Sequence, residues 1–234
     1  MILCNPQNPA GNIWDCETLA RIGALCKQYD VIVVSDEIHC DLTKPGTEYI
    51  PFASVDDTCR DISVTCIAPT KTFNLAGLQT AAVYAENSIL HHRMWRQLNT
   101  DEVAEPNAFA IQATIAAFQY GEEWLDELRE YVEKNKQYVT EFLQEKIPLI
   151  HPVAGEATYL MWLDCRKITE SGRQFAKFIR KTSGLYVSGG NQYGRGGEGF
   201  LRVNVATSKL VVEDGMQRLY ESVDAWLKEE KISK

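Results

Sequence analysis

The chain has 234 residues, of which 45% are hydrophobic and 24% are charged, a composition that is ordinary for a soluble globular protein of one or two domains. Its net charge of −8 disfavours a nucleic-acid or acidic-membrane partner, no apolar run is long enough to span a bilayer, and no signal peptide is visible. Seven scattered cysteines without a C-x-x-C pair indicate reduced thiols in a cytoplasmic protein, and four histidines without metal-ligand spacing give no reason to expect a metal.

The first half of the sequence alternates between helix and apolar strand. An amphipathic helix is predicted over residues 15–29, with Asp15 as its N-cap. Its apolar stripe is expected to contain Leu19, Ile22, Leu25, Cys26 and Tyr29. Strands are predicted at 31–36, 62–68 and 81–85, with a loop between Pro45 and Pro51. This alternation indicates an α/β domain with a mainly parallel sheet.

The second half is mostly helical. Helices are predicted at 87–99, 107–120 and 122–146, and the last of these is stopped by Pro148. A strand at 158–164, a helix at 171–182, a short strand at 185–188, a strand at 200–206 and a helix from about 209 follow. The glycine-rich loop 189–199 runs into a strand rather than a helix, which makes it a weak phosphate motif. We interpret it as a mobile active-site loop.

Polar side chains follow a short strand expected at Met1-Ile2-Leu3-Cys4 and the strand predicted at 31–36. The segment Asn5-Pro6-Gln7-Asn8-Pro9-Ala10-Gly11 is a rigid turn that presents the amide of Asn8 at a fixed angle, unless it is only an ordinary turn before a helix. The β-branched run 31–34 is typical of a strand buried on both faces, and it leads to Asp36. Open parallel sheets bind ligands at such strand ends. Asp36 is therefore either a ligand-binding residue or a cap on the next turn.

Two basic residues stand in comparable places. Lys71 lies in a polar turn directly after the apolar strand 62–68. A lysine held away from bulk water has a lowered pKa and can form a Schiff base; the alternative is a solvated surface lysine. Arg202 alternates with apolar residues in the strand 200–206. Its planar guanidinium suits bidentate capture of a carboxylate, and the alternative is a structural salt bridge on an edge strand.

Taken in this order, the segments resemble the fold type I, or aspartate-aminotransferase, superfamily of pyridoxal-phosphate (PLP) enzymes. The similarity is carried by S-D-E-I-H at 35–39, T-K-T-F-N-L-A-G-L-Q at 70–79, A-T-Y-L-M-W-L-D at 157–164 and Y-G-R-G-G-E-G-F-L-R-V-N at 193–204. It runs from residue 2 to about residue 228, and its details are most similar to the cystathionine β-lyase / cysteine-S-conjugate β-lyase branch. The resemblance implies an α/β fold, with 1–122 as the C-terminal part of the PLP-binding large domain. Residues 123–234 would form the connecting helix and a small α+β domain.

The resemblance also implies roles for individual residues. Lys71 would form the internal aldimine with PLP and then act as the base nearest the substrate Cα proton. Asp36 would stabilise the pyridinium, and Asn8 and His39 would contact the phenolic oxygen. Thr70 or Thr72 could supply a hydroxyl to the cofactor. Arg202 would bind the α-carboxylate of an amino-acid substrate. Active sites of this family lie at a homodimer interface, so a homodimer is expected.

The sequence departs from the family pattern in several places. Ala68 replaces a serine that often contacts the cofactor phosphate, and Gln79 replaces an arginine found in many aminotransferases. Gln79, like His39 in place of a tyrosine, is typical of the lyase branch. The phosphate-holding turn, the ring-stacking aromatic and the first segment of the small domain precede the aligned region in family members. We therefore expect more than a third of a normal member to be missing from this chain.

Three functions remain open at this stage. The first is a PLP-dependent carbon–sulfur β-lyase that converts cystathionine or a cysteine S-conjugate to a thiol, pyruvate and ammonia. The second is a class I/II aminotransferase, because the same residues serve both reactions. The third is an inactive fragment of such an enzyme. Pyruvate release without a keto-acid co-substrate distinguishes the first two, and the PLP absorbance of the purified protein tests the third.

Overall fold

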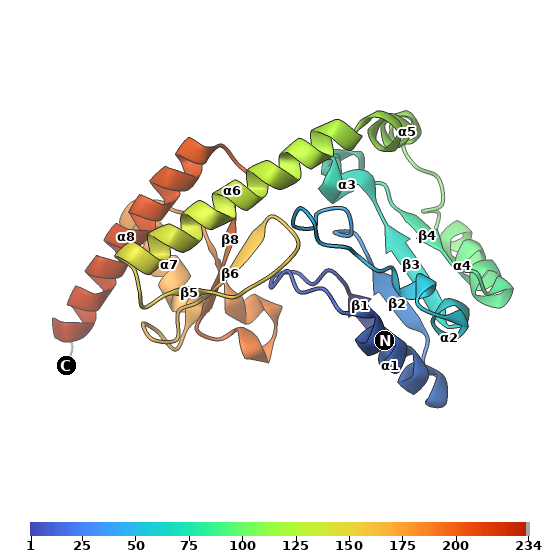
Figure 1. Cartoon of the computed structure of the whole chain (residues 1–234), viewed down its shortest axis with the longest axis horizontal. Coiled ribbons are helices and arrows are strands. Elements are labelled where there is room, and N and C mark those ends of the chain that lie inside the picture. The colour runs from blue at the N-terminus through green and yellow to red at the C-terminus, as the bar shows by residue number, and fades with distance from the viewer. Residues whose placement is uncertain (233–234) are drawn as a thin grey trace. The chain divides into compact units, whose positions relative to one another are not determined.

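The computed structural model describes residues 1–232, and side chains as far as residue 229. The described chain divides into two compact units (Figure 1). The first unit consists of Met1–Asn8, Asn12–Arg129 and Glu156–Thr158. The second consists of Pro9–Gly11, Glu130–Gly155 and the described chain from Tyr159 onward. Each unit therefore contains segments that are far apart in the sequence.

The first unit is built on a four-stranded sheet. Its strands are β1 (Ile2–Cys4), β2 (Val33–Asp36), β3 (Ser63–Ile67) and β4 (Ala82–Tyr84), in the spatial order β1-β2-β3-β4. The first three strands are parallel, and β4 runs antiparallel to β3. The prediction of a mainly parallel sheet is confirmed. Because β1, β2 and β3 run the same way, their carboxyl ends meet at one edge of the sheet.

Helix α1 (Cys16–Gln28) confirms the first helix prediction. The backbone N–H of Thr18 donates to Asp15 Oδ1 at 2.7 Å, so Asp15 is the N-cap as expected. The predicted stripe is wrong at two positions, because Leu25 and Tyr29 are 47% and 69% exposed. The helix packs instead along a line of positions three and four residues apart, with Leu19, Gly23 and Cys26 buried.

The core of the first unit lies where α1 meets two short helical segments and the first strands. These segments are the 3-10 turn η1 (Phe52–Ser54) and helix α2 (Asp57–Asp61), which the sequence did not predict. The buried cluster consists of Leu3, Leu19, Cys26, Val33, Phe52, Cys59 and Ile62. Gly23 allows close packing here, since a Cβ atom at this position would lie 2.3 Å from Cys59 Sγ.

Other apolar side chains of the first unit are exposed. In β2, Val33 and Ser35 are buried, whereas Val34 is only half-buried and Ile32, before the strand, is exposed, so the prediction of burial on both faces is wrong. All of β4 is exposed. Helix α4 (Ser88–Thr100) has no buried residue among those described, and α5 (Ala110–Tyr120) buries only Ala110. The exposed apolar side chains of α4 and α5 include Ile89, Trp95, Ile111, Ile115 and Phe118.

The second unit contains an antiparallel sheet and helices, the α+β arrangement expected of it. The strands β5 (His151–Pro152), β6 (Leu160–Asp164), β7 (Ser188–Gly189) and β8 (Phe200–Asn204) lie in the order β5-β6-β8-β7. Its helices are α7 (Gly172–Ser183), α8 (Lys209–Ile232) and most of α6 (Glu122–Lys146). The core includes Val139, Leu143, Leu163, Phe175, Ile179, Leu201, Met216 and Leu219.

Two predicted segments of the second unit need correction. The strand predicted at 185–188 is found at Ser188–Gly189, because the ladder to β8 begins only where Ser188 pairs with Arg202. The predicted loop 189–199 contains two 3-10 turns, η3 (Gly190–Tyr193) and η4 (Arg195–Gly197). Their backbones touch, since a Cβ atom on Gly190 would lie 2.3 Å from the carbonyl oxygen of Gly197. Glycine is therefore required at this crossing.

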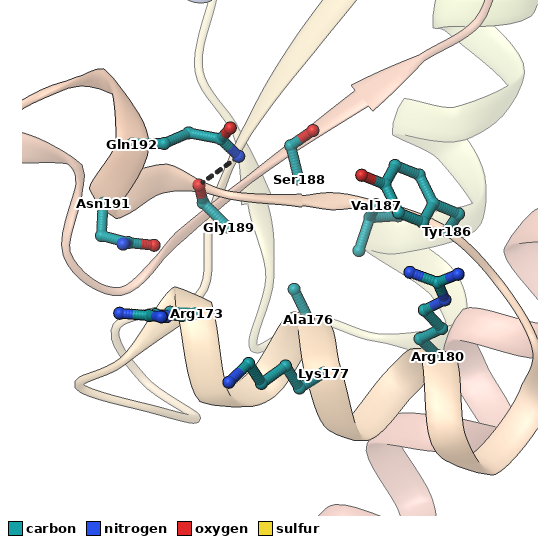
Figure 2. A pocket seen from close by; sticks show the side chains of 10 residues that line it. All are labelled: Arg173, Ala176, Lys177, Arg180, Tyr186, Val187, Ser188, Gly189, Asn191 and Gln192. Atoms are coloured by element: carbon teal, nitrogen blue, oxygen red, sulfur yellow. Dashed lines mark hydrogen bonds between the residues drawn. The ribbon is translucent and has the colours of Figure 1, made fainter.

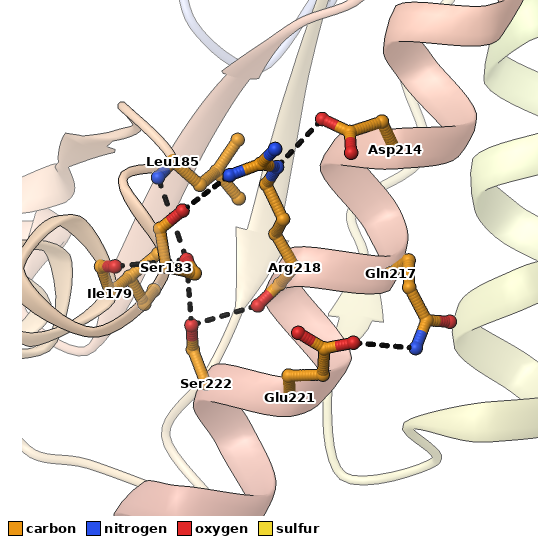
Figure 3. A network of polar contacts seen from close by, with 8 residues as sticks. All are labelled: Ile179, Ser183, Leu185, Asp214, Gln217, Arg218, Glu221 and Ser222. Atoms are coloured by element: carbon orange, nitrogen blue, oxygen red, sulfur yellow. Dashed lines mark hydrogen bonds and ion pairs between the residues drawn. The ribbon is translucent and has the colours of Figure 1, made fainter.

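The end of α7 is joined to α8 by a polar network (Figure 3). Gly184, at φ +74°, ends α7 in the left-handed conformation that glycine adopts without strain. The guanidinium of Arg218 donates to the free carbonyl of Ser183 at 2.7 Å, and its Nε donates to Asp214 at 2.7 Å. The hydroxyls of Ser183 and Ser222 lie 3.0 Å apart. These contacts satisfy the helix end and fix it on α8.

A late segment of the chain completes the first unit. Thr43 forms a β-bridge with Ala157, while Lys44 N–H donates to Glu156 O at 2.6 Å and Thr158 N–H donates to Leu42 O at 2.7 Å. Arg129 adds to this junction by donating to Thr43 O at 2.9 Å and to its Oγ1 at 2.8 Å. The first unit is consequently closed by backbone pairing between residues more than a hundred positions apart.

Candidate active site

Three predicted site residues gather where the parallel strands of the first unit end. β1 leads into the turn with Asn8, β2 ends in Asp36, and β3 leads into the four-residue helix α3 (Pro69–Thr72), which carries Lys71. The strand register places Asp36 between Cys4 of β1 and Cys66 of β3. Parallel sheets bind ligands at this edge.

The thiol of Cys4 shows how close Asn8 and Asp36 are. Burial raises the pKa of this thiol, a hydrogen bond from the backbone N–H of Asn8 lowers it, and the charge of Asp36 raises it. On the other side of Asp36, burial and then the charges of Asp36 and Glu37 raise the pKa of Cys66. Both thiols are therefore held neutral, and they flank a carboxylate that is only half-buried.

The turn with His39 and the helix with Lys71 are joined directly. The buried hydroxyl of Thr72 donates to Asp41 Oδ2 at 2.9 Å, which ties α3 to the turn that follows β2. His39 is buried in this turn, and Thr70 is half-buried beside Lys71. The five site residues predicted in the first unit (Asn8, Asp36, His39, Thr70 and Lys71) thus lie on three neighbouring segments that leave one sheet edge.

Lys71 itself is half-buried. Within residues 1–229, its ammonium makes no hydrogen bond and no ion pair. Most charged groups that leave bulk water acquire such a partner. The ammonium of Lys71 is therefore not held by another side chain of this part of the chain.

Arg202 belongs to the second unit, where it lies on β8 opposite Trp162 of β6 and Ser188 of β7. Its guanidinium carbon lies 4.9 Å from the ring centroid of Tyr193, a cation–π contact that holds the side chain in one orientation. Burial raises the pKa of Tyr159, and the positive charge of Arg202 opposes this shift. Arg202 is thus flanked by two phenol rings.

A groove of about 380 Å³ lies between α7 and β7 in the second unit (Figure 2). It is lined by the cations Arg173, Lys177 and Arg180, with no acid among its lining residues. Arg180 stacks over the ring of Tyr186 at 5.0 Å, and Gln192 donates to Gly189 O at 3.0 Å. The groove holds no nucleophile with an adjacent base, so the strand-edge cluster is the better candidate for an active site.

A buried group beside Asp36 was missed in the sequence. Glu37 is 2% exposed, and its Oε1 accepts hydrogen bonds from Ser35 Oγ at 2.9 Å and from Phe52 N–H at 3.1 Å. Tyr49, which follows in the loop, donates to Asn5 O at 2.8 Å. The alternation of side chains along a strand could have identified Glu37 as buried, because it places Ser35 and Glu37 on the side opposite Asp36.

The strand-edge cluster fits part of a pyridoxal group. A carboxylate, an amide, an imidazole and an amine are the groups that complement a pyridinium nitrogen, a phenolic oxygen and an aldehyde. For a phosphate the described cluster offers hydroxyls and no arginine. The chemistry of this cluster, on an α/β fold, is complementary to an aromatic aldehyde cofactor.

The comparisons with known proteins agree with this class. Residues 1–219 match the family model of class I and II aminotransferases. Cystathionine β-lyase PatB of Bacillus subtilis (strain 168) is 41% identical over 218 residues, which are 93% of this chain and 56% of that protein. The chain belongs to the aminotransferase class I and II family.

Solved structures give the same result. The PLP-bound C–S lyase from Staphylococcus hominis is similar with a TM-score of 0.85 and 34% identity, over 95% of this chain and 57% of that one. Cystalysin from Treponema denticola, which contains pyridoxal 5'-phosphate, is similar with a TM-score of 0.92 and 28% identity, over 96% and 57%. This chain spans little more than half the length of these relatives, which agrees with the share expected from the sequence.

No helix within residues 1–232 is both long and apolar enough to cross a bilayer. The same residues contain no group of three or more histidine, cysteine, aspartate or glutamate side chains arranged to hold a metal ion.

Proposed function

We propose that this chain carries the cofactor-binding and catalytic residues of a PLP-dependent carbon–sulfur β-lyase, acting on cystathionine or a cysteine S-conjugate. The observation that carries the proposal is the half-buried, unpaired amine of Lys71 at the same sheet edge as Asp36 and Asn8. The similarity to lyases of B. subtilis and S. hominis supports the reaction class.

Each residue of the cluster has a distinct task in this proposal. PLP, when bound, supplies the electron sink that stabilises a carbanion at the substrate Cα. Asp36 keeps a proton on the ring nitrogen by offering it a carboxylate partner. Asn8 and His39 contact the phenolic oxygen, and Thr70 supplies a hydroxyl. Lys71 would hold the cofactor through its amine, and the same amine would serve as the base for the substrate Cα proton.

Arg202 is proposed to hold the substrate α-carboxylate. Its contact with Tyr193 pre-orients the guanidinium, which reduces the entropy lost on binding. A fixed carboxylate sets the direction of the Cα–H bond, so that loss of the proton can expel the thiolate from Cβ. The aminoacrylate that is left hydrolyses to pyruvate and ammonia.

The proposal extends to organisation and setting. The PLP-binding part corresponds to residues 1–122 and the connecting helix with the small domain to 123–234, the last two of which lie outside the described chain. A homodimer is the assembly we propose, supported by the exposed apolar side chains of α4 and α5. All seven cysteines are free thiols, which supports a cytoplasmic setting.

Affinity for PLP is expected to be weak. The cluster gives the phosphate dianion hydroxyl partners but no cation, and each missing charge-assisted hydrogen bond removes roughly 1.5–3 kcal/mol. Titration with PLP at rising concentration should still give a saturable absorbance change in this chain.

The test is reduction of the PLP-loaded chain with borohydride, followed by peptide mass mapping. We expect a pyridoxyl adduct at Lys71 that is lost in Lys71→Ala and kept in Lys44→Ala, which alters an exposed lysine. The same preparation is then given cystathionine without a keto acid, and pyruvate is measured. An adduct spread evenly over exposed lysines would refute the site. Amino transfer that depends on a keto acid would show that the reaction is that of an aminotransferase and not of a lyase.

A further inference from the structure

The buried carboxyl of Glu37 is linked to the turn that presents Asn8. Glu37 lies next to Asp36 but on the opposite side of the chain, where Ser35 Oγ and Phe52 N–H donate to its Oε1. The phenol of Tyr49 also lies close enough to this carboxyl to lower its pKa, and its hydroxyl donates to the carbonyl oxygen of Asn5 at 2.8 Å. Tyr49 therefore stands between two acceptors, one on Glu37 and one on Asn5.

Asn5 anchors the start of the turn. Its side chain is fully buried, its N–H donates to Asp36 O at 3.1 Å, and its Oδ1 accepts from Trp14 N–H at 3.2 Å. Gln7 continues the turn by donating from its side chain to Asn8 O at 2.9 Å. The Asn5 carbonyl and Asn8 therefore belong to one hydrogen-bonded turn, three residues apart.

The hydroxyl of Tyr49 has one proton to donate. When Glu37 is ionised, the charged acceptor competes for that proton and the Asn5 carbonyl loses its donor. When Glu37 is protonated, its own O–H can donate to Tyr49, and Tyr49 then donates to Asn5. The protonation state of Glu37 decides which of the two arrangements forms.

We propose that Glu37 is a positioning residue of this site, which acts through Tyr49 and the Asn5 carbonyl on the turn that presents Asn8. The inference rests on the proposed function for its catalytic meaning. The hydrogen-bonded chain itself stands on the contacts described above.

The surroundings favour the protonated form. Burial is the main cause that raises the pKa of Glu37; hydrogen bonds from Ser35, Phe52 and Tyr49 oppose the shift, and the charge of Asp36 adds to it. Two thiols and a phenol also interact electrostatically with Glu37. Burial raises the pKa of Cys40 to about 12 and also raises those of Cys66 and Tyr49, so all three are neutral near pH 7.

The experiment compares the wild-type chain with E37Q and Y49F from pH 5 to 9. In E37Q the amide donates to Tyr49 at every pH, while its oxygen keeps the bonds from Ser35 and Phe52. In Y49F the Asn5 carbonyl has no hydroxyl donor at any pH. We expect the PLP affinity of the wild type to match that of E37Q at low pH and the weaker affinity of Y49F at high pH. The affinity should fall about fivefold between these limits, the equivalent of one hydrogen bond.

Amide hydrogen exchange gives a second readout that needs no cofactor. The N–H groups of Asn5 and Trp14 should exchange about fivefold faster in Y49F than in E37Q, with the wild type moving from one to the other as pH rises. Comparison at equal pH cancels the intrinsic pH dependence of exchange. If exchange behaves in this way while no form binds PLP, the proposed function fails and the positioning chain stands.

The raised pKa of Glu37 also predicts how the free energy of unfolding changes with pH. A carboxyl whose folded pKa is raised contributes stability below its unfolded pKa and loses it as pH rises through the folded value. The wild type should therefore lose stability relative to E37Q on going from about pH 4 to neutral pH. A wild-type to E37Q ratio that stays constant with pH, in both exchange and affinity, would overturn the proposal.

Discussion

The hydrogen bond between Thr72 and Asp41 makes a quantitative prediction about the segment that carries Lys71. Thr72 is 1% exposed, and its hydroxyl donates to Asp41 Oδ2 at 2.9 Å. Thr72→Val keeps the shape of the side chain and removes the donor. A hydrogen bond to a charged group contributes about 1.5–3 kcal/mol, but the half-buried Asp41 can regain water, so we expect a loss of about 1 kcal/mol.

The assay has to report on α3 rather than on the whole chain, because two units need not unfold together. The N–H of Phe73 donates to Pro69 O at 2.9 Å and that of Leu75 donates to Thr70 O at 3.1 Å, so their exchange rates report local opening. Both rates should rise about fivefold in Thr72→Val, the equivalent of about 1 kcal/mol. Thr72→Ser, which retains the donor, is the matched control.

A double-mutant cycle with Asp41→Ala isolates the pair. The double variant should lose little more stability than either single variant, with a coupling energy near 1 kcal/mol. A coupling below about 0.3 kcal/mol would refute the reasoning, because the two side chains would then act independently.

Three further outcomes follow from packing and burial. Leu201→Ala, at a fully buried position of β8, should lower the free energy of unfolding by about 2–5 kcal/mol in urea titration. Gly190→Ala should separate the crossing backbones of the glycine loop and speed proteolysis there, whereas Gly196→Ala, whose Cβ meets nothing within 4 Å, should not. At pH 8 the exposed Cys16 should react with a thiol reagent in the folded chain, while Cys165, whose pKa burial raises strongly, should react only after unfolding.

Local signals in the sequence predicted the elements well. The cap at Asp15, the stop at Pro148 and the β-branched run before Asp36 each act within a few residues, so they set element type and bounds without help from distant contacts. The strand ends followed from the same signals. The cluster of Asn8, Asp36 and Lys71 could therefore be predicted, because parallel strands bring their carboxyl ends together whatever covers them.

What failed depends on neighbours that periodicity does not specify. Leu25 and Tyr29 match an apolar stripe but are exposed, because the line of contact on α1 follows Gly23 and the Cys59 side chain against it. The role of Glu37 depends on Tyr49, a loop residue with no periodic signal. Such contacts are decided by three-dimensional packing, which a single sequence does not encode in any local pattern.

The pairing of Thr43 with Ala157 has a consequence for how the chain is made. Synthesis proceeds at roughly 5–20 residues per second, and domains tend to fold as soon as they have emerged from the ribosome. The first unit, however, gains its closing bridge only after residue 158 has been synthesised. The second unit likewise includes Pro9–Gly11, where a Cβ atom on Gly155 would lie 2.1 Å from Ala10 O. A nascent chain that stalls near residue 130 would therefore hold most of the first unit without its last strand-like segment, exposed to chaperones and proteases.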